Sequence, residues 1–130
     1  MSSAAILVVD DNPTNLKLVR VLLQSMGYQV ATAVDAEDAL EKLRGPLPRL
    51  VLMDLQLPGM DGLELVRRLK ADPRTCRLTI VAVTAYAMRG DEERARAAGC
   101  DDYVTKPIDV DGLPKMVERW LREVPGEVEL

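Results

Sequence analysis

Apolar runs of strand length alternate with segments of helical period along the whole chain. The strand-like runs cover residues 5–9, 29–34, 50–55, 78–84 and 102–105. The third and fourth runs are almost continuously apolar, which is typical of central parallel strands that are buried on both faces. This alternation predicts an α/β fold in which a doubly wound, five-stranded parallel sheet is covered by five helices.

The helical segments have recognisable ends. The first covers residues 14–26 and stops before Gly27, and the second begins after Asp35, the expected N-cap, and runs to residue 43. The other three are predicted over residues 63–70, 89–98 and 113–122. The run RGDEERAR in the fourth segment has few apolar residues, so it predicts a solvated helix face.

Composition limits the class of protein. The 130 residues predict one domain over residues 1–124, with residues 125–130 as a short tail. Lys and Arg total 17 against 21 for Asp and Glu, a net charge of −4 that argues against nucleic-acid binding. The start, MSSAAILVVDD, lacks the basic region of a signal peptide, and no apolar run approaches the roughly 20 residues of a membrane span. We therefore expect a complete cytoplasmic protein without membrane contacts.

The chain has no histidine and two cysteines. Zinc sites and Ser-His or Cys-His catalysis are therefore not expected. Cys76 and Cys100 are expected to be free thiols, buried or half-buried. If phosphoryl chemistry occurs here, the chain cannot form a phosphohistidine, so the phosphoryl group must arrive from another molecule.

Polar residues stand where several of the predicted strands stop. Asp10 and Asp11 follow the first strand, Asp54 follows LVLM in the third, Thr84 ends the fourth, and Lys106 follows the fifth. Ligands of open α/β sheets bind outside the carboxyl ends of the strands, so these groups should gather at one edge. Three converging carboxylates predict a site for a hard divalent cation, Mg²⁺ or Mn²⁺.

Asp54 is the candidate nucleophile of this edge, because it precedes the turn LQLPGMDG and should project into the cluster. A carboxylate can attack phosphorus to form an acyl phosphate. That step needs a metal ion, a fixed cation and donors for the equatorial oxygens. Lys106 is the candidate cation, and the Thr84 hydroxyl and the Ala85 amide are the candidate donors.

The segments VVDD, LMDLQLPGMDG, VAVTA and YVTKP, in this order, resemble the receiver domain of two-component response regulators. Each motif alone is weak, but all four in order are specific, and the resemblance extends from about residue 6 to residue 121. It implies a CheY-like, flavodoxin-like fold and a signalling module that is not a classical enzyme. Such a module takes its phosphoryl group from a histidine kinase or a histidine phosphotransfer protein in a magnesium-dependent reaction.

The resemblance also implies roles for single residues at the metal site. Asp54 would be the phosphoacceptor. Asp11 and Asp54 would bind Mg²⁺ directly, together with the main-chain carbonyl of Gln56. Asp10 would act on the metal largely through water.

Further roles concern the phosphoryl group and the signal. Thr84, Ala85 and Lys106 would hold the phosphoryl oxygens. Thr84 and Tyr103 would form the conformational switch. A downstream protein partner would then bind the face formed by the fourth helix, the fifth strand and the fifth helix.

The sequence leaves several alternatives open. A narrower resemblance, in DDNPTNLKLV and VTAYAMRGDEERARAAGCDDYVTKPI, is to stand-alone receivers of the DivK kind and to receivers of hybrid histidine kinases. We expect a single-domain regulator, and a receiver excised from a hybrid kinase that acts in a phosphorelay is the alternative. Haloacid-dehalogenase-like phosphatases begin with Asp-x-Asp, which the run Asp10-Asp11-Asn12 does not match. A scaffold without the chemistry would usually lose the acceptor or the lysine, and this chain keeps both.

Overall fold

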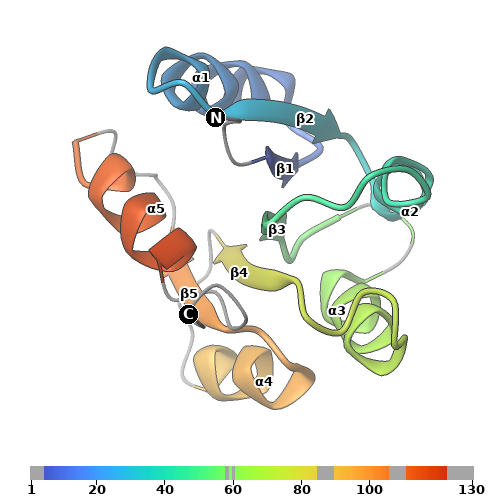
Figure 1. Cartoon of the computed structure of the whole chain (residues 1–130). Helices are drawn as coiled ribbons and strands as arrows, with labels where there is room; N and C mark the ends of the chain where they lie inside the picture. The colour runs from blue at the N-terminus through green and yellow to red at the C-terminus, as the bar shows by residue number, and fades with distance from the viewer. Residues whose placement is uncertain (1–4, 58, 60, 85–89, 106–110, 123–130) are drawn as a thin grey trace.

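Strands and helices alternate as predicted, in a computed structural model that describes residues 5–57, 59, 61–84, 90–105 and 111–122 (Figure 1). The strands are β1 (Ala5–Val9), β2 (Gln29–Ala33), β3 (Leu50–Asp54), β4 (Thr79–Thr84) and β5 (Asp102–Thr105). The helices are α1 (Pro13–Ser25), α2 (Ala36–Lys42), α3 (Gly62–Ala71), α4 (Asp91–Ala98) and α5 (Leu113–Arg122). The predicted start of α4 at residue 89 and the predicted tail at 125–130 lie outside the described residues.

All five strands form one parallel sheet in the order β2-β1-β3-β4-β5, which confirms the doubly wound α/β fold. The order reverses between β1 and β3, and this reversal is where open α/β sheets bind their ligands. In the register, Val9 pairs with Met53, and Asp54 pairs with Val83. The carboxyl ends of β1, β3 and β4 therefore lie next to one another.

Two cores sandwich the sheet, because successive side chains of a strand point to opposite faces. Val51 and Ile80 belong to the core beneath α2, α3 and α4. Leu52 and Val81 belong to the core beneath α1 and α5. Figure 1 shows α1 and α5 on one side of the sheet and the other three helices on the opposite side.

Polar side chains cap the helices that lie next to the site. Asn12 is the N-cap of α1, Asp35 is the N-cap of α2 as predicted, and Asp61 is the N-cap of α3. Each accepts a hydrogen bond from a backbone N–H of the first helical turn, which would otherwise lack a partner within the helix. The turns that carry the site therefore join the helices through defined caps.

Helix α4 buries only small side chains among those that the structure describes. Ala95 and Ala98 are the buried residues among its described side chains, and the rest are exposed. This confirms the solvated face predicted for RGDEERAR.

Both cysteines were expected to be buried or half-buried. This is confirmed for Cys100, which is buried, but it is wrong for Cys76. Cys76 is exposed because it lies in the turn between α3 and β4.

Candidate functional site

Three buried polar residues mark the strand ends at the reversal of strand order. Asp10 follows β1, Asp54 ends β3 and Thr84 ends β4, and they are 5%, 2% and 1% exposed, respectively. Asp11 lies beside Asp10 and is exposed. Buried carboxylates require hydrogen-bonding or ionic partners, so this edge of the sheet is a polar site rather than a part of the apolar core.

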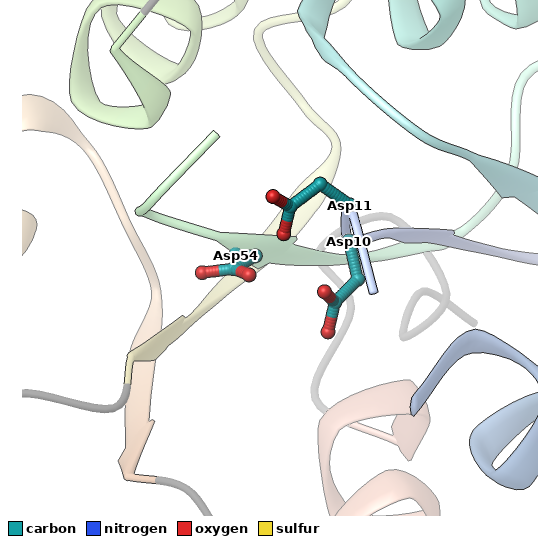
Figure 2. A group of neighbouring side chains, drawn as sticks. All are labelled: Asp10, Asp11 and Asp54. Atoms are coloured by element: carbon teal, nitrogen blue, oxygen red, sulfur yellow. The ribbon is translucent and has the colours of Figure 1, made fainter. Parts of the chain in front are cut away.

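The three carboxylates converge, as the sequence predicted. One oxygen each from Asp10, Asp11 and Asp54 lies within 4.8 Å of the others. Figure 2 shows the first two side chains on the segment that follows β1 and Asp54 beside them on β3. Oxygen ligands grouped in this way suit a hard cation such as Mg²⁺. The residues present therefore fit the ion that the resemblance implies.

The turn after β1 holds Asp10 in place. Its backbone N–H donates to the carbonyl of Ala33 at 3.0 Å, and its carboxylate accepts from the backbone N–H of Asn12 at 2.9 Å. The Asn15 side chain donates to the same carboxylate at 3.5 Å. The two asparagines were not predicted as supports of the site, although DDNPTN places both within one turn of the carboxylates.

The loop after β3 holds Asp54. The backbone N–H of Gln56 donates to Asp54 Oδ1 at 2.9 Å. Gly62, the first residue of α3, lies so close that a Cβ there would be 2.8 Å from the carbonyl oxygen of Asp54 and 2.8 Å from Leu55 Cα. Only glycine avoids this contact, so Gly62 lets α3 begin directly against the end of β3. The segment LQLPGMDG does not by itself show this close approach of Gly62 to the strand end.

The side chain of Gln56 contacts the strand end next to Asp54. Its Nε2 donates to Thr84 Oγ1 at 2.7 Å. The main-chain carbonyl of Gln56 was predicted as a metal ligand, but the contact of its side chain with Thr84 was not predicted, because no local pattern shows where a loop side chain points. One loop residue thus contacts both the central carboxylate and the buried hydroxyl.

Tyr103 lies on β5, paired with Ala82 of β4, and its ring packs against the core beneath α2, α3 and α4. It is partly buried. Lys106 and Ala85, the predicted cation and amide donor, lie outside the described residues. Their roles, like the switch role of Tyr103, stay predictions.

Asp102, at the start of β5, connects the elements of the predicted partner face. Its carboxylate accepts from Trp120 Nε1 on α5 at 2.6 Å and pairs with Arg96 of α4 at 3.4 Å. Trp120 is 4% exposed, so the indole is packing rather than partner surface. The carboxylate thus joins α4, β5 and α5 into one unit.

The sheet and the cluster together define a class of protein: an α/β domain with an acidic, metal-type site at the reversal of its strand order. The family model of the response regulator receiver domain matches residues 6–118. The chain belongs to this family, whose members are signalling modules that bind Mg²⁺ at an acidic pocket.

Individual relatives agree with this assignment. The polar-differentiation response regulator DivK of Brucella anthropi is 42% identical over 117 residues, which are 90% of this chain and 95% of the relative. A CheY-like receiver domain protein of Methanospirillum hungatei JF-1 superposes with a TM-score of 0.89 at 30% identity and covers 97% of this chain and 99% of its own.

A third relative carries a metal ion. The receiver domain of a sensor histidine kinase of Pseudomonas aeruginosa PAO1, with a magnesium ion coordinated in its active site cleft, superposes with a TM-score of 0.85. It is 34% identical and covers 94% of this chain and 100% of its own.

Among the described residues of the present chain, no helix is both long enough and apolar enough to cross a membrane.

Proposed function

We propose that this receiver domain accepts a phosphoryl group on Asp54 and passes on a signal through phosphorylation-dependent protein contacts. The observation that carries the proposal is the convergence of Asp10, Asp11 and Asp54, with carboxylate oxygens within 4.8 Å of one another. Asp54 is the central member, because it is buried at the end of β3 and held by the backbone of Gln56.

The proposed reaction transfers a phosphoryl group between two proteins. A carboxylate oxygen of Asp54 attacks the phosphorus of a phosphohistidine, so that an O–P bond forms while the N–P bond breaks and the imidazole leaves. Mg²⁺, held by Asp11, Asp54 and the Gln56 carbonyl, would neutralise the charge that gathers on the oxygens. Thr84, Ala85 and Lys106 would hold the phosphoryl oxygens.

A phosphohistidine donor lies outside these 130 residues, because they contain no histidine. Helix α1 starts directly after the carboxylate turn and exposes Leu18 and Val21, which are 47% and 51% exposed. They lie three residues apart, on one side of the helix. We propose that this patch receives the histidine-bearing helix of a kinase or a phosphotransfer protein in the cytoplasm, close to Asp54.

Mass spectrometry tests the acceptor. With acetyl phosphate and Mg²⁺, the wild-type protein should gain one phosphoryl group, and neither Asp54→Asn nor wild type in EDTA should gain any. Equal labelling of wild type and Asp54→Asn would refute the assignment. Phosphotransfer profiling against the histidine kinases of the source organism would then identify the donor.

A second candidate function is a relay step within a hybrid kinase, which is favoured by the similarity to the Pseudomonas sensor kinase receiver. A relay receiver passes its phosphoryl group on to a second histidine. Rapid transfer from phosphorylated Asp54 to a histidine phosphotransfer protein would support this role. A phosphoryl group that leaves only by hydrolysis would support the stand-alone regulator.

A further inference from the structure

Gln56 links two groups of the site that come from different strands. Its backbone N–H donates to Asp54 Oδ1 at 2.9 Å, and its side-chain Nε2 donates to Thr84 Oγ1 at 2.7 Å. Gln56 and Thr84 are 28 residues apart in the chain. Gln56 itself is exposed, whereas Thr84 is 1% exposed, so the carboxamide reaches inward from the loop to a buried hydroxyl.

The direction of this hydrogen bond determines what the hydroxyl can do. A threonine hydroxyl has one hydrogen to donate and two lone pairs that accept. When an amide N–H occupies one lone pair, the hydroxyl cannot donate its hydrogen to that amide nitrogen. The hydrogen must then point to a different acceptor. Asp54 is near, because it pairs with Val83 in the register of β3 and β4, and Val83 directly precedes Thr84.

We propose that Gln56 is a positioning residue, whose carboxamide orients the Thr84 hydroxyl as a hydrogen-bond donor toward the phosphoryl group on Asp54. This inference rests on the proposed function and adds to it the device that prepares Thr84 before phosphorylation. A donor that is already oriented does not have to be reoriented when charge appears beside it.

The chemistry of the side chain at position 56 separates this proposal from a packing role. Methionine has a similar length but offers no N–H, so Gln56→Met no longer restricts the rotation of the hydroxyl. Glutamate can only accept when it is ionised, so Gln56→Glu would take the hydroxyl hydrogen for itself. Because residue 56 is exposed, neither change should prevent folding.

The test is the affinity for beryllofluoride, an acyl-phosphate mimic, measured by calorimetry at saturating Mg²⁺. Gln56→Met should weaken binding about threefold to tenfold, the range of one net hydrogen bond. Gln56→Glu should weaken it further, because its charge also repels the anion. Gln24→Met is the matched control, since Gln24 is exposed on α1, and it should bind like wild type.

A double-mutant cycle makes the test specific. In a Thr84→Ala background, Gln56→Met should have no further effect on beryllofluoride affinity, because the hydroxyl that it positions is gone. The same loss in both backgrounds, or no loss in either, would overturn the inference. A wild-type protein that binds no beryllofluoride would overturn the proposed function and this inference with it.

The hydrogen bond can also be tested without metal. In EDTA, the shifts in unfolding midpoint of Gln56→Met and Thr84→Ala should be less than additive when the two changes are combined, since either change alone already breaks the bond. Fully additive shifts would show that the two side chains do not interact in solution, which would overturn the inference.

Discussion

Replacing Asp11 by asparagine should stabilise the metal-free protein. Asp11 contributes one of three carboxylates whose oxygens lie within 4.8 Å of one another. Without a cation between them, these negative charges repel one another, and the repulsion is present in the folded state but largely absent from the unfolded chain. An asparagine would keep the shape of the side chain and remove its charge.

The distances set the size of the effect. Two unit charges 4.8 Å apart repel by about 0.9 kcal/mol at the dielectric constant of water and by about 3.5 kcal/mol at an effective dielectric constant of 20. Asp11 is exposed, so the lower value applies to each of its two neighbours, and salt reduces it further. We therefore expect a gain of roughly 1–2 kcal/mol in unfolding free energy, a midpoint shift of about 3–8 °C.

Thermal melts of wild type and Asp11→Asn, in EDTA and in Mg²⁺, measure this change in stability. Wild type should gain stability when Mg²⁺ is added, by about 2.7 kcal/mol at a hundredfold excess over the dissociation constant, and Asp11→Asn should lose most of that gain. Glu118→Gln is the matched control, because it removes one negative charge from the exposed face of α5. An Asp11→Asn protein that is no more stable than wild type in EDTA and still responds fully to Mg²⁺ would refute the reasoning.

Three further predictions concern the elements around the site. Gly62→Ala should lower the unfolding free energy by about 1–3 kcal/mol in chemical denaturation, because its Cβ would overlap the end of β3, whereas Gly45→Ala, with nothing within 4 Å, should have little effect. Trp120→Phe removes the indole N–H that bonds the carboxylate at the start of β5, so it should lower the unfolding free energy by about 1–2 kcal/mol; an unchanged denaturation midpoint would contradict this. Burial raises the pKa of the Cys100 thiol to about 11 from its ordinary value of 9.0, so at pH 8 a thiol reagent should label the exposed Cys76 quickly and Cys100 slowly. The unfolded chain releases the Cys100 proton at a lower pH than the folded protein does. The unfolding free energy should therefore fall as the pH rises from about 9 to 11.

The order of elements and the parallel sheet could be predicted from the sequence because they depend on local periodicity. All five residues of β3 are buried, and the continuous apolar run LVLM indicated this. Topology then predicted part of the site, since residues that follow parallel strands share one edge. The structure brings Asp10, Asp11 and Asp54 together at that edge.

Only the tertiary structure decided which neighbours support these residues. Asp10 is buried and the adjacent Asp11 is exposed. Two consecutive aspartates in a sequence do not show which of them is buried. Likewise, no pattern in LQLPGMDG shows that the Gln56 side chain turns back to a strand 28 residues away. Periodicity reports which face of an element meets the core. The contacts of a loop side chain depend instead on the path of the backbone between elements, which forms only when the helices and the sheet have packed.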